Sequence, residues 1–322
     1  MSPTQLFGGR WEVVKSFDEG GQSYVYKVRD RNGEFTEELV LKRLKNLKRL
    51  DRFEREIKSC RQLSHSGIAP VLAYSLDDPP FFVTKFYEGG PITTHAPFLP
   101  IPALNLFIQL CDIISYAHTK GVIHRDLKPD NIVLNRDRSP VIIDFGLCYL
   151  QEEERRITAT MEQVGSRFYI APELEQGQLE KVTDKVDSYS LGKILYFLLT
   201  GRNIAREAYR GDNEISKVCN NEQLSYVSDR IIACSVVENP NDRKSVAELG
   251  KEARNVKRLI IEHYYPGAEG SLCRFCGEGH YGRFTKSTIR IREPGIEHSV
   301  DFDFLICDKC RNIQWFRFPD RR

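Results

Sequence analysis

The feature that most constrains this chain is a polar stretch, His-Arg-Asp-Leu-Lys-Pro-Asp-Asn, at residues 124–131. An apolar run follows at residues 132–134, and after a turn the chain reads Val-Ile-Ile-Asp-Phe-Gly at residues 141–146. Short apolar runs bounded by turn residues are typical of buried strands. We therefore expect two acids, a lysine and an amide to lie on loops that neighbouring strands hold still.

These side chains suit the transfer of a phosphoryl group. Asp126 is predicted to accept the proton of an attacking hydroxyl, and Lys128 to neutralise the group in transfer. Asn131 and Asp144 offer the hard oxygen ligands that Mg²⁺ or Mn²⁺ prefers. The alternative is that these polar residues lie on loops by chance. So many residues suited to phosphoryl transfer, at fixed positions within residues 124–146, argue against it.

The two stretches resemble the catalytic and metal-binding loops of eukaryotic-type protein kinases, whose signatures are H-R-D-L-x-x-x-N and D-F-G. Further landmarks of that family follow in order across residues 10–262. Residues 39–42, Leu-Val-Leu-Lys, resemble its V-A-I-K strand. The resemblance implies that Lys42 reaches the phosphates of ATP. It also implies that Glu56, on a helix expected at residues 45–63, pairs with Lys42.

The resemblance further implies a glycine-containing loop over the phosphates of ATP. A hairpin is expected over residues 11–28, and it keeps Gly20 and Val25 of the family's G-x-G-x-x-G-x-V pattern. Glycine lets backbone N–H groups approach phosphates closely, because it has no Cβ. Asp18 and Ser23 replace the other two glycines, so this loop departs from the family's pattern.

A hinge between two lobes is expected at residues 87–90, Tyr-Glu-Gly-Gly. It follows an apolar stretch at residues 81–86, which is predicted to form a buried strand. The resemblance places Thr84 at the back of the adenine pocket, where its small side chain would leave a deep cavity.

Three residues are expected to hold the catalytic region in place. Residues 165–173, Gly-Ser-Arg-Phe-Tyr-Ile-Ala-Pro-Glu, resemble the family's G-T-x-x-Y-x-A-P-E anchor. The resemblance implies that Glu173 pairs with Arg243, from a motif similar to D-P-x-x-R. It also implies that Asp187, at the start of an apolar helix, ties the backbone of the catalytic loop. An aspartate at a helix start equally suits plain capping.

Arg125, beside Asp126, is the expected regulatory residue. Residues 147–170 are polar, as is typical of a mobile loop. In the family, kinases with this arginine are commonly activated when a phosphate on that loop pairs with it. Thr158 and Thr160 are the expected phosphorylation sites, since a phosphothreonine carries about −1.5 to −2 charge. Two alternatives stay open: Glu162 supplies the anion, or the threonines are simply solvated.

Four cysteines near the end of the chain form two Cys-x-x-Cys pairs: Cys273, Cys276, Cys307 and Cys310. Each such turn presents two thiolates, so two turns complete a tetrahedral site for one structural Zn²⁺. Iron in the same four-thiolate cage is the alternative. Apolar residues alternate with polar ones between and after the pairs, which predicts strands. The region resembles a zinc ribbon, and it is so small that the metal would contribute most of its folding energy.

Charge argues against nucleic-acid binding by this region. From residue 269 onward the chain has ten basic and eight acidic residues. A phosphate-binding surface needs a clear basic excess. A role in protein contact or in capping a lobe is therefore favoured.

Composition excludes several other classes of protein. The 322 residues are 41% hydrophobic and 29% charged, with a net charge of +2, which is ordinary for a globular protein. No apolar run approaches the roughly 18 residues of a membrane span, and no signal-peptide pattern opens the chain. Nine cysteines, four of them in metal-type pairs, favour a reducing compartment, so a cytoplasmic location is expected.

The predicted fold class is α+β, a bilobal protein-kinase fold with a small β-rich N-lobe and a large helical C-lobe. A three-stranded zinc ribbon is expected to follow it. The expected bounds are 10–86 for the N-lobe, 87–90 for the hinge, 91–263 for the C-lobe, 264–271 for a linker and 272–322 for the ribbon.

The predicted function is ATP-dependent phosphorylation of serine and threonine hydroxyls on protein substrates. Lys128 and the Gly-Ser before the Ala-Pro-Glu anchor resemble the serine/threonine branch of the family. One alternative is a nucleotide-binding pseudokinase that acts as a scaffold through its ribbon, for which Asp18 and Ser23 argue mildly. A small-molecule kinase is another, although the anchor segment favours proteins. The sequence names no particular substrate and does not set the oligomeric state.

Overall fold

The computed structural model of the chain describes residues 5–17, 23–77, 79–145, 149–150, 168–177, 182–206, 208–264, 281–293, 296–307 and 313–316. The chain divides into two compact units, Met1–Arg254 and Asn255–Arg322.

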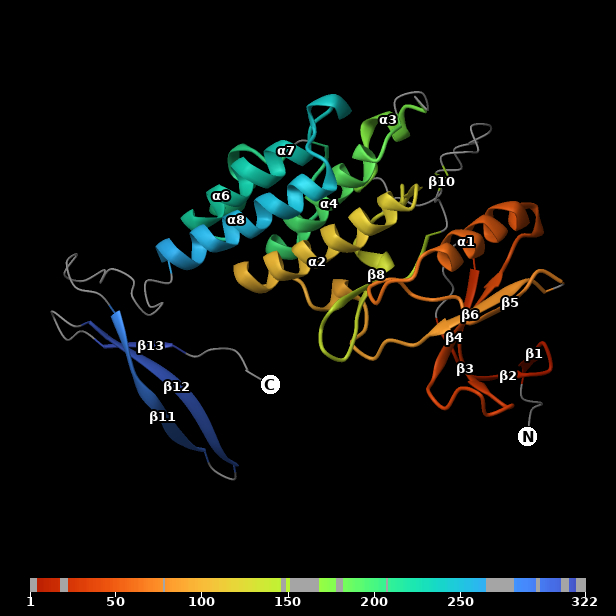
Figure 1. Ribbon diagram of the computed structural model, residues 1–322, viewed down its shortest axis with the longest axis horizontal. Coiled ribbons are helices and arrows are strands. Elements are labelled where there is room, and N and C mark those ends of the chain that lie inside the picture. The colour runs from red at the N-terminus through yellow and green to blue at the C-terminus, as the bar shows by residue number, and fades with distance from the viewer. Residues whose placement is uncertain are drawn as a thin grey trace. The chain divides into compact units, whose positions relative to one another are not determined.

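The first unit begins with a six-stranded antiparallel sheet in the order β1-β2-β3-β4-β6-β5 (Figure 1). Its strands are β1 (Leu6–Phe7), β2 (Trp11–Ser16), β3 (Ser23–Asp30), β4 (Leu39–Leu44), β5 (Ala73–Ser75) and β6 (Phe81–Lys85). Side chains alternate between the two faces of a strand, so Leu39 and Leu41 of β4 are both buried. They join Val28 and Val83 in the core of the N-lobe. The strands expected near residues 11–28, 37–44 and 81–86 are present, and β1 and β5 are additional.

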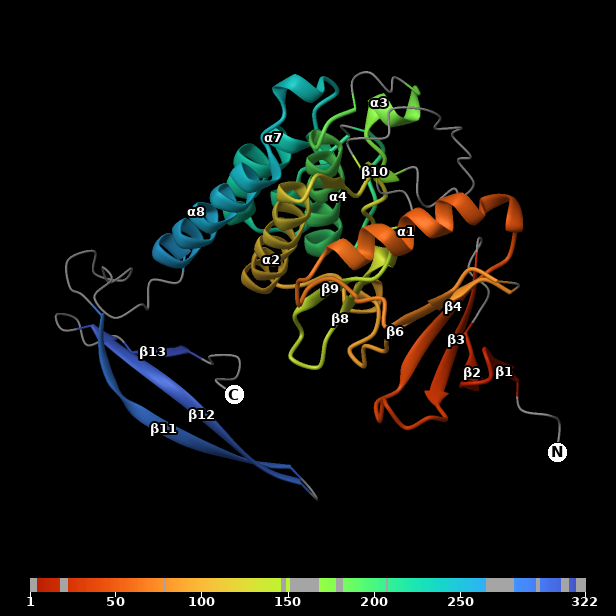
Figure 2. The same ribbon diagram turned by 45° about the vertical axis from the view of Figure 1, so that its right-hand side comes forward.

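Helix α1 (Leu50–Gln62) packs against this sheet, as Figures 1 and 2 show. Phe53, Ile57 and Cys60 are buried at helical spacing, which gives the helix one apolar face. The ring of Phe53 lies 5.4 Å from that of Phe82 in β6. Glu56 shares this face and is 5% exposed. The packing of α1 against the sheet therefore buries the carboxylate of Glu56.

The larger part of the first unit is helical and is built around α2 (Pro100–Thr119) and α4 (Lys185–Thr200), which pack together (Figure 2). The other helices are α3 (Pro172–Glu175), α5 (Ile215–Val218), α6 (Ser225–Val227), a π-helical turn (Ser228–Ile232), α7 (Ala233–Ser235) and α8 (Val246–Tyr264). Two small antiparallel ladders, β7 (Val122–Ile123) with β10 (Tyr149–Leu150) and β8 (Ile132–Leu134) with β9 (Pro140–Ile142), flank the catalytic stretches.

Helix α2 begins at Pro100 and has two prolines in its first turn. Proline is tolerated there because the first N–H groups of a helix have no intrahelical partner. Among the helices in the described part of the chain, α2 alone has the length and mean hydropathy, 1.2, of a membrane span. The same composition suits a core helix, and half of that span is buried.

The second unit contains a three-stranded antiparallel sheet of β11 (Tyr281–Glu293), β12 (Ile296–Cys307) and β13 (Ile313–Phe316). These strands cover the alternating stretches from which strands were predicted. Cys307 is the last residue of β12 and lies in register with Tyr281, the first residue of β11.

Candidate active site

The catalytic stretch lies between β7 and β8, and hydrogen bonds within it fix Asp126. The Nδ2 of Asn131 donates to the backbone carbonyl of Asp126 at 2.9 Å and to its Oδ2 at 3.4 Å. The Nζ of Lys128 donates to the same Oδ2 at 3.1 Å. The carboxylate of Asp126 is thus held by an ammonium and an amide, which is an arrangement suited to receiving a proton in a fixed direction.

Helix α4 anchors this loop from beneath through Asp187, which is 0% exposed. Its two carboxylate oxygens accept hydrogen bonds from the backbone N–H groups of His124 and Arg125, both at 2.9 Å. Arg125 has a left-handed backbone with φ of +65°, which costs about 1–3 kcal/mol for a residue with a side chain. The bond to Asp187 helps to hold that conformation.

His118 of α2 completes the anchor. Its Nε2 lies 2.8 Å from Oδ2 of Asp187, and its Nδ1 lies 3.8 Å from Oδ2 of Asp184. Burial alone would raise the pKa of Asp187, but the bond from His118 and the N–H groups of the loop hold it below its ordinary value. The spacing of 69 residues between His118 and Asp187 explains why no local pattern revealed the contact.

Lys42 of β4 joins the two lobes of the site. Its Nζ donates to Oε1 of Glu56 at 2.7 Å and to Oδ2 of Asp144 at 2.9 Å. Burial would lower the pKa of Lys42, but the two carboxylates outweigh it and raise that pKa. Burial raises the pKa of Glu56 to about 7; Lys42 opposes this shift and Asp144 adds to it. One ammonium therefore serves two acids.

The residues around Lys42 and Asp144 are suited to binding a nucleotide together with Mg²⁺. Asn131 uses its amide nitrogen for Asp126, so its Oδ1 has no partner among the described residues. The N–H of Ile143, next to Asp144, donates to the carbonyl of Asn131 at 3.0 Å and brings the two expected metal ligands together. Thr84 is 7% exposed, and its Oγ1 also lacks a partner in the described part of the chain. Val25 is paired with Lys42 in the β3–β4 ladder.

The hinge residues connect the sheet to the helical part. Gly90 has φ of +70°, and its carbonyl accepts from the N–H of Leu134 at 2.8 Å. A Cβ at Gly89 would lie 2.4 Å from the carbonyl oxygen of Leu134, so only glycine fits there.

Glu173 and Arg243 form a buried two-pronged ion pair. The Nη1 of Arg243 lies 2.7 Å from Oε1 of Glu173, and Nη2 lies 2.8 Å from Oε2. Its remaining N–H groups donate to the backbone carbonyls of Val237, Glu238 and Lys185 at 2.7, 2.9 and 3.3 Å. A buried guanidinium needs this degree of hydrogen bonding, because burying an unpaired charge is costly.

Some predicted site residues lie outside the described residues. These are Gly20, Thr158, Thr160, Cys273, Cys276 and Cys310, together with Asp18 and Glu162. Cys307 is described only by its backbone position in β12. The structure therefore leaves the glycine loop, the phosphorylation sites and the metal cage as predictions.

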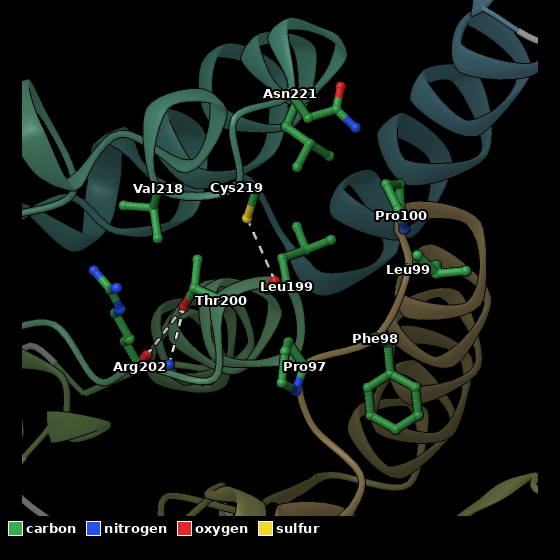
Figure 3. Close-up of a pocket in the computed structure, with 11 residues that line it drawn as sticks. Pro97, Phe98, Leu99, Pro100, Leu199, Thr200, Arg202, Val218, Cys219 and Asn221 are labelled. Atoms are coloured by element: carbon green, nitrogen blue, oxygen red, sulfur yellow. Dashed lines mark hydrogen bonds between the residues drawn. The ribbon is translucent and has the colours of Figure 1, made fainter.

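A separate hollow of about 380 Å³ lies where the start of α2, the end of α4 and α5 come together (Figure 3). Its walls are mostly apolar, and the residues that line it are Pro97, Phe98, Leu99, Pro100, Leu199, Thr200, Arg202, Val218, Cys219, Asn221 and Leu224. None of them is an acid, and Thr200 and Leu199 lie at the end of α4 opposite Asp187. This hollow is not part of the phosphoryl-transfer site.

The acids, the lysines and the amide thus meet between a small sheet and a helical lobe. This combination is typical of an enzyme that transfers a phosphoryl group from a magnesium-bound nucleotide. The family model described as "Protein kinase domain" matches residues 11–259. The chain therefore belongs to the protein kinase family.

Relatives of the chain include bacterial serine/threonine kinases. The DNA damage-responsive serine/threonine-protein kinase RqkA of Deinococcus radiodurans is 35% identical over 212 residues, covering 62% of this chain and 31% of the relative. The serine/threonine-protein kinase PrkC of Bacillus subtilis is 31% identical over 204 residues, covering 60% and 31%. PknB of Mycobacterium leprae is 27% identical over 270 residues, covering 77% and 43%. The chain thus spans less than half the length of these relatives.

Proposed function

We propose that this chain phosphorylates serine and threonine hydroxyls of protein substrates with ATP. The observation that carries the proposal is the set of contacts that joins Lys42 to Glu56 and Asp144, and Asp126 to Lys128 and Asn131. These residues come from both lobes, and each has a use in phosphoryl transfer. The serine/threonine kinases among its relatives support the choice of acceptor.

In this mechanism Asp126 orients the acceptor hydroxyl and takes its proton. The acceptor oxygen forms a bond to the γ-phosphorus, the bond from that phosphorus to the β–γ bridging oxygen breaks, and ADP leaves. Lys128 lies beside the carboxylate of Asp126, and there it offsets negative charge on the phosphoryl group. Lys42, held by Glu56, positions the phosphates of ATP. Asn131 and Asp144 would hold Mg²⁺, which neutralises phosphate charge when bound.

Substitution of Asp126 tests the proposal directly. Asp126→Asn keeps the shape and size of the side chain but removes the carboxylate that accepts the proton. We expect loss of phosphoryl transfer by a factor on the order of 10² or more, with an unchanged melting temperature. Lys42→Met and Asp144→Asn should abolish transfer in the same way. The measurement is transfer of radiolabel from ATP to casein, beside Asp137→Asn, which alters an exposed loop acid, as a matched control.

The rival is a pseudokinase scaffold that binds nucleotide without transferring phosphate. It requires that the contacts of Lys42 and Asp126 serve binding alone. Transfer by Asp126→Asn at the wild-type rate would show that Asp126 is not the proton acceptor and would contradict the proposed mechanism. A wild-type chain that binds ATP but labels neither casein nor itself would favour the rival.

We infer that phosphorylation of Thr158 or Thr160 activates the chain. Arg125, 9% exposed, lies beside Asp126, and a phosphothreonine near it would add one to three charge-assisted hydrogen bonds. Mass spectrometry after incubation with Mg-ATP should find phosphate on at least one of the two threonines. The Thr158→Ala/Thr160→Ala double variant should lose activity. Full activity without phosphate on either residue would point instead to Glu162.

We also propose that the second unit is a zinc ribbon that contacts proteins. The register of β11 and β12 supports this, since Cys307 ends β12 opposite the start of β11. Cys276 precedes Tyr281 by only five residues, and Cys310 follows Cys307 by three. Along the chain, both Cys-x-x-Cys pairs thus come within a few residues of Tyr281 and Cys307, which are in register, and this spacing supports a shared metal.

A further inference from the structure

A buried lysine, Lys193, lies in the middle of α4, outside the catalytic site. It is 2% exposed and sits between Leu191 and Ile194, which are themselves buried. Lysine is almost never fully buried unless its ammonium is hydrogen-bonded, because desolvating the charge is costly. The Nζ of Lys193 donates to the backbone carbonyl of Ile204 at 2.9 Å and to that of Arg206. The core helix thus holds the loop that follows it.

That loop, residues 201–206, in turn holds both ends of one segment. Oδ1 of Asn203 accepts from the hydroxyl of Tyr169 at 2.5 Å. The Nη2 of Arg206 lies 2.7 Å from a carboxylate oxygen of Glu175. Tyr169 and Glu175 are the first and last residues of the segment that includes the Ala-Pro-Glu anchor. The loop of residues 201–206 therefore contacts both ends of the segment of residues 169–175.

The backbone of Arg206 shows that its position is imposed by its surroundings. Its φ is +41°, in the left-handed region that residues with a side chain rarely adopt. Such a conformation persists only where neighbouring contacts determine it. The bond from Lys193 to the carbonyl of Arg206 is one of these contacts, and the pair with Glu175 is another.

The same segment lies close to the catalytic loop. The hydroxyl of Ser190, one turn before Lys193 on α4, donates to the carbonyl of Tyr169 at 2.8 Å. Burial raises the pKa of Tyr169, and the negative charge of Asp130, in the catalytic loop, adds to that rise. Tyr169 is therefore close enough to the catalytic loop for the charge of Asp130 to act on it.

We propose that Lys193 is a positioning residue for the protein substrate: through Asn203 and Arg206 it sets the place of residues 169–175, on which the acceptor segment lies. The proposal rests on the proposed kinase function, and it concerns substrate placement and not nucleotide binding. In this proposal Lys193 acts through residues 201–206 and not by contact with ATP or the acceptor. Its removal is expected to loosen the surface that presents the acceptor hydroxyl to Asp126, and small misplacements of a reacting group are costly.

The test is a comparison of KM values in Lys193→Met, which keeps the length of the side chain but removes the ammonium. With dephosphorylated casein as acceptor, we expect the KM for casein to rise about tenfold, while the KM for ATP stays within about twofold. Lys193→Arg, which keeps the charge, should recover part of the loss. Melting temperatures identify variants that fail to fold.

A second variant keeps the test decisive if Lys193→Met is unstable. Asn203→Ala removes an exposed side chain and its bond to Tyr169, so it should raise the KM for casein without unfolding the protein. The matched control is Arg202→Ala, an exposed neighbour whose side chain forms no bond that the structure records with residues 169–175. In a double-mutant cycle, Lys193→Met and Asn203→Ala should be less than additive, because they act on one loop.

An unchanged KM for casein in both variants would overturn the proposal, as would an equal rise in the KM for ATP. A wild-type chain that transfers phosphate to neither casein nor itself would instead refute the kinase function on which the proposal rests.

Discussion

At the scale of single residues, one ammonium group, that of Lys42, is hydrogen-bonded to two carboxylates of the site. Lys42 lies within hydrogen-bond distance of both Glu56 and Asp144; the side chain of Glu56 is buried, whereas those of Lys42 and Asp144 are partly exposed. Two carboxylates beside one ammonium cannot both be fully compensated, so burial dominates for Glu56 and favours its neutral form. Glu56 thus ionises near neutral pH, and its ionisation strengthens the electrostatic attraction between its carboxylate and the ammonium of Lys42.

The raised pKa of Glu56 gives opposite trends for stability and activity. The folded protein keeps a proton on Glu56 between its ordinary pKa of 4.5 and about 7, whereas the unfolded chain loses it. The contribution of Glu56 to folding stability is therefore full below the ordinary pKa and falls as pH rises through that window. Activity should rise over the same window, because ionised Glu56 holds Lys42 in place.

Glu56→Gln tests this dependence. We expect kcat/KM for ATP in the wild type to increase with pH around neutrality, with an inflection at about pH 7. The variant should lose that inflection and show values lower by about tenfold, or roughly 1.4 kcal/mol. Glu54→Gln is the matched control, since Glu54 is on the same helix and pairs at 3.1 Å with the exposed Lys58. Persistence of the inflection in Glu56→Gln would assign it to another group.

At the scale of elements, α4 is the part that organises the helical lobe. Its first turn holds the catalytic loop through Asp187, and its middle holds the following loop through Lys193. It ends at Gly201, whose φ of +68° closes the helix in the left-handed conformation. A helix buried along most of its length can fix several loops at once, because it has little freedom to move.

Asp187→Asn is expected to weaken both the fold and the chemistry. The amide nitrogen of asparagine cannot accept a hydrogen bond, so at least one buried donor from His118, His124 or Arg125 loses its acceptor. We expect the free energy of unfolding to fall by about 1–3 kcal/mol, and kcat to fall as the catalytic loop loosens. Denaturant unfolding and steady-state kinetics measure the two effects.

The control for this variant is Asp184→Asn, at the exposed start of the same helix. Its carboxylate lies 3.8 Å from His118, so its loss should change stability by less than about 1 kcal/mol. The lowered pKa of Asp187 adds a second check. Its stabilising contribution is present above the ordinary value of 3.8 and is lost as pH falls through the folded pKa, a loss that Asp187→Asn should reduce. Equal effects of the two variants would contradict an anchoring role for Asp187.

At the scale of the whole molecule, we expect the two units to depend on different sources of stability. The first unit has a large apolar core in each lobe, with residues such as Leu41, Val83, Leu104 and Ile194 fully buried. The second unit contains one small sheet of three strands. A sheet of that size rarely folds alone without a metal, a disulfide or a partner.

Metal analysis of the purified chain should therefore find about one zinc per chain. Cys307→Ser should release the metal and remove amide protection beyond about residue 270, while the kinase unit keeps its melting temperature. Cys234→Ser is the control, because Cys234 belongs to the first unit. Finding iron would change the metal but keep the site. Finding neither metal, with the C-terminal strands still protected in hydrogen exchange, would exclude the ribbon.

The sequence by itself determined the chemistry and the order of the main elements. The strand and helix patterns at residues 39–44, 50–62 and 81–85 are local, because periodic burial is written in neighbouring residues. The identities of Asp126, Asn131 and Asp144 likewise indicated phosphoryl transfer before any geometry was known. The short strands β1 and β5 were not predicted from the sequence, because two or three residues are too few to show a periodic pattern.

Only the tertiary structure decided which distant residues hold the site. His118 meets Asp187 across 69 positions, and Tyr169 meets Asn203 across 34. The contact of Glu173 with Arg243, across 70 positions, was implied by the family resemblance and not by any local pattern. Nothing in the local pattern around His118, Lys193 or Asn203 signals a partner, because a buried polar group is satisfied by whatever the fold brings within about 3 Å of it. The sequence thus indicated which groups suit the chemistry, and the packing of α2, α4 and the loops determined what keeps those groups in place.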